Sequence, residues 1–284
     1  MLKNSKLIIA LAALFISTTG FAQRSKTDPK HENWYKTTKF ETDEMTVEIV
    51  DANAQSNVCK LKIKITNKTN DYILYKPGET EFVYDFGTFN PKGGLAIING
   101  KNELIEPKES DSRVLNVTGD TRFHVENFTI NFKGFYRISS KGTVVKAPDF
   151  TLPASTNDFE TGPFKVLMTN ISKETKQTAI RFKVTYANDN KHYGLVSLGK
   201  AVMRIESGQE FAMANQKDKQ VLLEDGKDDK FNYYYEIPGK VVDMQFANMW
   251  LVWKETFRES EMVPIAVKPV AMTYDAGLTD GKNK

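Results

Sequence analysis

Cys59-Lys60-Leu61-Lys62-Ile63-Lys64-Ile65-Thr66 alternates apolar and polar residues without a break. A second stretch, Ala179-Ile-Arg-Phe-Lys-Val-Thr-Tyr186, alternates in the same way. Successive side chains of a β-strand point to opposite faces of its sheet, so a period of two predicts strands with one buried face. Aligning Ile65 with Val184 gives an offset of 184 − 65 = 119 residues. The same strand pattern therefore occurs twice, at a domain-sized distance.

A second pair of similar stretches follows in the same order. Phe128–Tyr136 resembles Val242–Trp250, and aligning Phe132 with Phe246 gives an offset of 246 − 132 = 114 residues. Two landmarks at similar spacing predict a duplicated all-β module. The repeat is much longer than the repeats of solenoids and propellers.

Short strand-like segments separated by turn residues fill both halves of the chain. Leu95–Ile98, Asn99-Gly100 and Lys101–Ile105 carry the signature of a hairpin, because Asn-Gly accepts the positive φ angles of a type I′ turn. The charged stretch Lys254–Met262 predicts one turn of helix. Many short strands with few helical patterns predict an all-β fold of two tandem immunoglobulin-like β-sandwich domains.

Composition shifts divide the chain into domains. Ala147–Asp158 carries two prolines among small and turn-forming residues, so we place a linker at residues 147–162. The first sandwich, with an N-terminal arm, is then expected at residues 23–146 and the second at residues 163–275. Residues 276–284 are expected to form a flexible tail.

The strand pattern of the whole chain after residue 22 resembles the tandem immunoglobulin-like domains of exported bacterial proteins. The chain lacks the Cys…Trp…Cys spacing of antibody domains, since Cys59 is its only cysteine. The resemblance implies the fold and export from the cytoplasm, and the proteins that it points to have no characterised role.

The first 22 residues have the order of a secretory signal peptide. Lys3 and Lys6 form the positive region, Leu7–Ile16 is uninterruptedly apolar, and small residues precede a cleavage site before Gln23. Ten apolar residues are too few to span a bilayer core of about 30 Å. The Gly-Phe-Ala-Gln junction resembles signal peptides of the Bacteroidetes. We expect an exported protein that begins at Gln23, in the periplasm rather than at the cell surface or outside the cell.

Cleavage leaves a nearly neutral chain. The sequence holds 39 basic and 36 acidic residues, and removing two lysines leaves a net charge of 37 − 36 = +1. This balance offers no electrostatic footprint for nucleic acid. Cys59 shares the apolar face of its predicted strand, so we expect a buried, unreactive thiol without an intrachain disulfide.

The sequence lacks the usual signatures of catalysis. His31, His124 and His192 lie far apart, and none has a metal-ligand spacing. The G-x-S-x-G motif of hydrolases is absent. The acidic cluster Glu224–Asp229 departs from the calcium-binding loop pattern and contains Lys227, so a solvated hairpin turn is favoured over a cation site. We therefore predict no catalytic, cofactor-binding or metal-binding residues.

Aromatic residues of the second module are the remaining candidates for a site. Tyr233, Tyr234 and Tyr235 must occupy both faces of a strand, and Trp250 and Trp253 point to opposite faces of another. Exposed rings suit a protein interface or sugar stacking, whereas buried rings are part of the core. We take these five residues as candidate partner-binding residues.

Together these features predict an exported, non-catalytic binding or scaffolding protein of the cell envelope that engages a protein partner. A carbohydrate-binding protein is the first alternative, and it requires several coplanar exposed rings. A carboxylate-dependent glycosidase is the second, and it requires a pair of acids about 5–10 Å apart.

Overall fold

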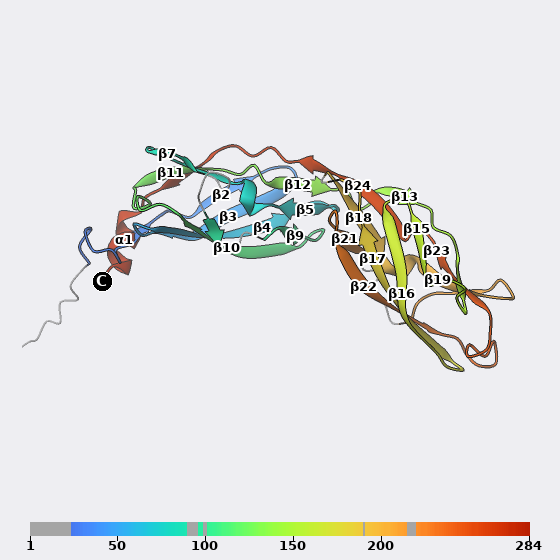
Figure 1. Ribbon diagram of the computed structural model, residues 1–284. Helices are drawn as coiled ribbons and strands as arrows, with labels where there is room; N and C mark the ends of the chain where they lie inside the picture. The colour runs from blue at the N-terminus through green and yellow to red at the C-terminus, as the bar shows by residue number, and fades with distance from the viewer. Residues whose placement is uncertain (1–23, 90–95, 99–100, 190, 215–219) are drawn as a thin grey trace, which may run out of the picture.

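The computed structural model describes residues 24–89, 96–98, 101–189, 191–214 and 220–284 (Figure 1). The described chain is an elongated, bent body of antiparallel strands in two halves, joined end to end (Figure 1). Its one described α-helix, α1 (Ala276–Lys282), is short. The expected all-β class is therefore confirmed.

Among the described residues, the first half contains twelve strands from the N-terminal part of the chain and one from its C-terminal part. They are β1 (Asn33–Trp34), β2 (Thr38–Glu41), β3 (Met45–Ala54), β4 (Val58–Asn67), β5 (Tyr72–Tyr75), β6 (Glu81–Tyr84), β7 (Gly87–Phe89), β8 (Ala96–Ile98), β9 (Glu103–Ile105), β10 (Ser110–Thr118), β11 (Asn127–Asn131), β12 (Phe135–Ile138) and β25 (Val270–Thr273). A 3-10 helix, η1 (Pro77–Glu79), links β5 to β6.

The second half contains the remaining strands. They are β13 (Thr143–Val145), β14 (Phe150–Leu152), β15 (Asp158–Thr161), β16 (Phe164–Lys173), β17 (Gln177–Tyr186), β18 (His192–Ser197), β19 (Ala201–Ile205), β20 (Glu210–Phe211), β21 (Gln220–Leu223), β22 (Asp228–Glu236), β23 (Met249–Trp253) and β24 (Phe257–Pro264). A 3-10 helix, η3 (Leu198–Lys200), links β18 to β19.

The two halves repeat the same order of strand pairings. In the first half β3, β4 and β10 are neighbours, and in the second half β16, β17 and β22 are neighbours. A strand, a 3-10 helix and a strand then follow in both halves. Val47 pairs with Ile65, and Val166 pairs with Val184, so both partners are displaced by the 119 residues that the sequence indicates. The 119-residue spacing found in the sequence therefore recurs in the register of the strands.

The second sequence landmark is aligned wrongly. Val242–Phe246 is not a strand, because the Asp243 side chain and carbonyl accept the amides of Gln245 and Ala247 and hold the backbone in a turn. The counterpart of β11 is β23. Ile130 pairs with Phe82 and Leu251 with Met203, which gives an offset of 251 − 130 = 121 residues.

Each half encloses its own apolar core between facing sheets. The cores form because the alternating strands β4 and β17 each turn one set of apolar side chains inward. Ile63 and Phe182, which the 119-residue offset of the two sequence stretches places in equivalent positions, are both fully buried. Gly194 lets β18 approach the second core closely, since a Cβ there would lie 2.6 Å from the Tyr186 ring.

The two halves share a seven-stranded sheet at their junction. β24 of the second half pairs with β12 of the first, with Pro264 opposite Tyr136. A third apolar cluster covers this joint; its buried members are Tyr72, Leu74, Ile138, Tyr193 and Leu195. The joint is thus a continuous, packed sheet.

The predicted linker at residues 147–162 is largely structured. β14 pairs with β23 and β15 with β16, so both strands belong to the second half. Phe150 and Leu152 are buried in the second core, which explains why a proline-containing segment is held in an extended strand.

The C-terminal segment returns to the first half. The sequence places residues 270–273 in the second module, but β25 pairs with β11, and Met272 lies fully buried opposite Phe128. The predicted flexible tail instead contains α1, which Asp275 caps by accepting the Leu278 amide at 2.9 Å. Asn283 is fully buried and donates to the Glu32 carbonyl at 2.9 Å. The two ends of the described chain are therefore tied together.

Two local predictions also differ from the structure. The expected hairpin does not form between β8 and β9, because β8 pairs with β10 and β9 pairs with β5 in another sheet. Asn99 and Gly100, the predicted turn, lie outside the described residues. The expected helical turn at Lys254–Met262 is mostly strand β24, since pairing with β12, β13 and β18 overrides the local charge pattern.

Candidate functional site

Three of the five candidate aromatic residues lie in the second core. Tyr233, Tyr235 and Trp253 are 1%, 0% and 6% exposed, so none presents its ring to a partner. Strand alternation explains this, because β22 turns its odd-numbered residues from Phe231 onward inward. Tyr234, between two buried tyrosines, is 45% exposed.

Trp250 and Tyr234 do not form a common platform. Trp250 is half-buried on β23, in the sheet that contains β14, β19 and β20. Its ring lies 5.7 Å from the guanidinium carbon of Arg204. Tyr234 belongs to the facing sheet of β15, β16, β17 and β22. The coplanar exposed rings that sugar binding requires are therefore not present among these five residues.

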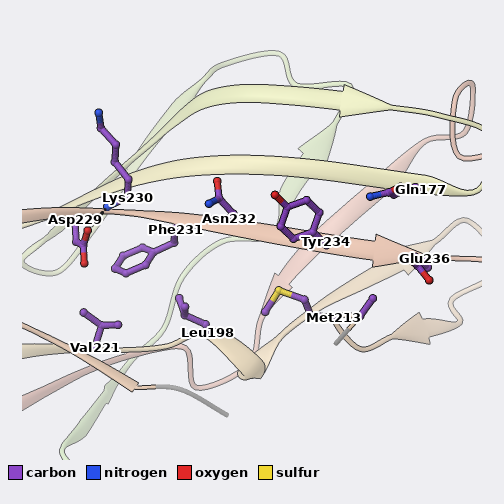
Figure 2. A pocket seen from close by; sticks show the side chains of 11 residues that line it. Gln177, Leu198, Met213, Val221, Asp229, Lys230, Phe231, Asn232, Tyr234 and Glu236 are labelled. Carbon is purple, nitrogen blue, oxygen red and sulfur yellow. Dashed lines mark hydrogen bonds between the residues drawn. The ribbon is translucent and has the colours of Figure 1, made fainter. Parts of the chain in front are cut away.

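A depression of about 610 Å³ lies beside β22 (Figure 2). We call it the β22 pocket. It is lined by Gln177, Leu198, Met213, Ala214, Val221, Asp229, Lys230, Phe231, Asn232, Tyr234 and Glu236. In Figure 2, β17 lies on one side of β22, and Leu198, Met213 and Val221 lie on the other side. The pocket thus combines an apolar floor with the polar outer face of a strand.

β22 is an edge strand among the described residues. Its ladder joins it to β17 alone, and one further backbone bond reaches it, from the Ala214 amide to the Tyr234 carbonyl at 2.8 Å. The Ile237 amide points the other way and donates to Lys176 at 3.1 Å. The backbone groups of Tyr234 face away from β17, toward Ala214. Because the direction alternates along a strand, the backbone N–H and C=O groups of Asn232 and Glu236 face away from β17 as well.

Charges of both signs border the β22 pocket. Lys183 lies 3.3 Å from Asp228 beside it, and the Asn232 side chain accepts from Arg181 at 2.7 Å. Asp229, Lys230 and Glu236 are exposed along the same strand. This mixture favours a neutral ligand with hydrogen-bonding groups over a strongly charged one.

The acids of the β22 pocket do not form a glycosidase pair. Asp229 and Glu236 lie seven residues apart on one strand, which corresponds to about 24 Å. This is well beyond the carboxyl separations of such enzymes. Hydrogen bonds from Arg122 and Lys133 lower the pKa values of Asp120 and Glu81, and both of these carboxyls lie in the first half.

The acidic cluster Glu224–Asp229 connects β21 to β22 through a turn with Gly226 at φ +70°. It is not a hairpin, because β21 pairs with β18 whereas β22 pairs with β17. Glu224 accepts from the Asn102 side chain at 3.0 Å, across the joint between the halves. Among the described residues, no group of three or more His, Cys, Asp or Glu side chains is arranged to hold a metal ion.

The structure brings together two histidines that the sequence leaves apart. His31 Nδ1 and His124 Nε2 are 2.8 Å apart, and His31 is only 3% exposed. Burial, with further contributions from His31 and Lys26, lowers the pKa of His124. His192 instead bonds to Asp189 at 2.8 Å, and this hydrogen bond raises the pKa of its ring. No local spacing in the sequence signals the pair, which is formed by residues 93 positions apart.

Cys59 is buried, as expected, with 0% exposure. Burial raises the pKa of its thiol to about 12. A thiol with this pKa is almost wholly protonated near neutral pH and is a poor nucleophile. Its environment therefore matches that of a core residue.

The predicted signal peptide lies outside the described residues. In the part of the chain that the structure covers, no helix has both the length and the apolar character needed to cross a membrane.

No protein-family model and no curated protein matches the chain. Similarity to solved structures is slight. The secreted serine protease VesC from Vibrio cholerae is 11% identical with a TM-score of 0.17, over 78% of this chain and 48% of VesC. Vicilin from Corylus avellana is 7% identical with a TM-score of 0.18, over 84% of this chain and 85% of vicilin. The chain thus spans about half the length of VesC, and neither similarity supports a functional argument.

Proposed function

We propose that this is an exported, non-catalytic binding or scaffolding protein of the cell envelope that engages a protein partner through its second half. The predicted signal peptide supports export, and the periplasm is the favoured location. The observation that carries the binding role is the β22 pocket, where the exposed Tyr234 ring stands beside a hollow with an apolar floor. Aromatic residues next to apolar pockets are typical anchors of protein interfaces.

The elongated shape supports a scaffolding role. The joint between the halves is a continuous sheet covered by a packed apolar cluster, so the two halves move as one unit. A stiff body with a site in one half can hold a partner at a fixed distance from whatever the other half contacts. We also propose that the halves are tandem immunoglobulin-like sandwiches, and their shared order of pairings supports this.

A carbohydrate ligand is the alternative that one observation favours. Tyr234 is flanked by the amide side chain of Asn232 and by Glu236, and such a combination can stack on and hydrogen-bond to a sugar. The weakness of this alternative is the single ring. The glycosidase has less support still, because the acids of the pocket are too far apart.

Site-specific crosslinking in the mature chain tests the proposal. A photoreactive benzoyl-phenylalanine replaces Tyr234, and in a matched control it replaces Val114, which is 40% exposed on the first half. Both proteins are illuminated in envelope extract with and without excess unlabelled protein. We expect a discrete protein adduct from position 234 that the competitor removes, and none from position 114.

A glycan array with the same protein separates the alternatives. Adducts from position 114 alone would show that the partner binds the first half, and this would contradict the proposal. Selective glycan binding without any protein adduct at position 234 would replace the protein partner with a carbohydrate.

A further inference from the structure

The internal repeat identifies a counterpart for β22 in the first half. Ile65 pairs with Asp111, and its equivalent Val184 pairs with Asp229, so β10 and β22 are related by 229 − 111 = 118 residues. By this offset Asn116, Val117 and Thr118 correspond to Tyr234, Tyr235 and Glu236. The two strands therefore hold the same position in their halves.

The two strands differ in what lies on their outer side. β10 pairs with β4 on one side and with β8 on the other, where Asn116 faces Ile98 and Thr118 faces Ala96. β22 has the equivalent inner partner, β17, but among the described residues no strand pairs with its outer side. Where β8 forms a ladder in the first half, the described residues of the second half provide one backbone bond, from the Ala214 amide to the Tyr234 carbonyl. The first half thus shows which kind of segment fits this edge.

Several backbone groups of β22 are directed outward. The amides of Asn232, Tyr234 and Glu236 point away from β17, whereas the odd-numbered residues face it. The Lys230 amide is already held by the Asp229 side chain at 2.7 Å. Three amides spaced two residues apart match the repeat of an incoming extended chain.

The β22 pocket can accept one face of such a chain. Phe231 and Leu198 are buried at its floor, and Val221 and Met213 are half-buried at its wall. An added strand directs every second side chain toward this floor and the others toward Asn232 and Tyr234. An apolar residue on the inner side would cover the floor and remove its apolar surface from water.

We infer that the outer edge of β22 binds an extended peptide segment of the partner by strand addition, with an apolar side chain in the β22 pocket. This inference rests on the proposed function, since it names the form in which a protein partner would be recognised. The segment expected is short and rich in small or β-branched apolar residues, as Ala96–Ile98 is in the first half. Its backbone supplies the affinity, and the pocket selects the side chain.

Amide hydrogen exchange on the mature chain, followed by NMR, tests the inference. The probe is a synthetic peptide with the sequence Gly-Leu-Ala-Ile-Ile-Asn-Gly-Lys, that of residues 94–101. In the free protein the Asn232 amide is expected to exchange at least tenfold faster than those of Tyr233 and Tyr235. With the peptide near 1 mM, exchange at Asn232 and Tyr234 is expected to slow at least fivefold.

Two variants and a control peptide sharpen the test. Met213→Glu places a charge at the pocket wall, and Asn232→Pro removes one outward amide without removing a bond to β17. Each should abolish the slowing, while Val114→Lys on the first half should preserve it. A peptide with both isoleucines replaced by aspartate should have no effect. Circular dichroism and the melting temperature confirm that each variant is folded; if one fails to fold, the other decides.

Two results would overturn the inference. The first is an Asn232 amide that is already protected in the free protein, since the chain itself would then cover the edge. The second is a peptide that leaves the amides of β22 unchanged. A partner that crosslinks at position 234 but ignores Met213→Glu and Asn232→Pro would refute strand addition and leave the proposed function standing. Peptide binding at β22 without any crosslinked partner would support strand addition and refute the proposed protein partner.

Discussion

The hydroxyls of two nearby tyrosines in β22 have different surroundings. Tyr235 donates to the Ala201 carbonyl at 2.9 Å, whereas the buried Tyr233 hydroxyl has no hydrogen-bond partner among the described residues. A buried polar group without a partner costs about 1–3 kcal/mol, and a made hydrogen bond contributes about 1 kcal/mol. Tyr233→Phe should therefore raise the free energy of unfolding by about 1 kcal/mol, and Tyr235→Phe should lower it by about 1 kcal/mol. Urea unfolding of both variants measures the difference, and a loss of stability in Tyr233→Phe would contradict it.

The lowered pKa of His124 makes stability depend on pH. The unfolded chain takes up a proton near pH 6.5, before the folded chain does. Burial of the neutral His124 ring therefore contributes its full stability above this pH and loses it as pH falls through 6.5 toward the folded pKa. We expect the stability advantage of the natural protein over His124→Gln to shrink between pH 8 and pH 5.5.

His192 provides a control of opposite sign. The hydrogen bond to Asp189 raises the pKa of His192, so its contribution is present below pH 6.5 and is lost as pH rises through the folded value. The His192 side chain is 34% exposed and Asp189 49%, so solvent screens the interaction and the effect is small. Urea unfolding at each pH should show the advantage over His192→Gln growing slightly from pH 8 to pH 5.5. The same direction of change in both variants would contradict the assignment.

At the scale of single residues, alternation predicts relations between neighbours better than absolute positions. Tyr234 must face away from Tyr233 and Tyr235, and Trp250 away from Trp253, and both relations hold in the structure. Alternation does not indicate which face is buried, because that depends on the facing sheet. The contact between His31 and His124 depends on the path of 93 residues and has no local signal.

Strand β25 belongs to the first half although it lies far from its partner β11 in the sequence. Met272 is fully buried against the first core, while its neighbour Thr273 is exposed. Met272→Ala should lower the free energy of unfolding by about 2–5 kcal/mol, because it leaves a cavity among Phe128 and the residues around it. Thr273→Ala should change it by less than about 0.5 kcal/mol. Thermal and urea unfolding measure both, and equal effects would show that β25 does not pack as described.

The sequence predicts the strands themselves well and their partners poorly. β4 extends the predicted stretch Cys59–Thr66 by one residue at each end, and β17 extends the predicted stretch Ala179–Tyr186 by two residues at its start. Their alternation is a local property. The return of β25, the separation of β8 from β9 and the strand character of β24 depend on pairing with distant segments.

For the whole molecule, the shared sheet predicts cooperative unfolding. Ile73 and Leu74 are neighbours on β5, yet Ile73 belongs to the first core and Leu74 to the cluster at the joint. Leu74→Ala should uncouple the halves and split a single calorimetric transition into two. Ile73→Ala should lower the free energy of unfolding by about 2–5 kcal/mol, as Leu74→Ala does. It should therefore lower the transition temperature but keep a single transition. A natural protein that already shows two transitions would contradict the coupling.

The return of β25 also governs when the first half can finish folding. A chain emerges from the ribosome, or from a secretion pore, with its N-terminus first, so β11 is free long before β25 arrives. Tyr35 forms its bridge with Tyr274, and Glu32 bonds to Asn283, so these contacts form only after residues 274 and 283 have been synthesised. Contacts this far apart in sequence are slow to form. The first half therefore stays incomplete until β25 has been synthesised, although all its other strands are made before the second half.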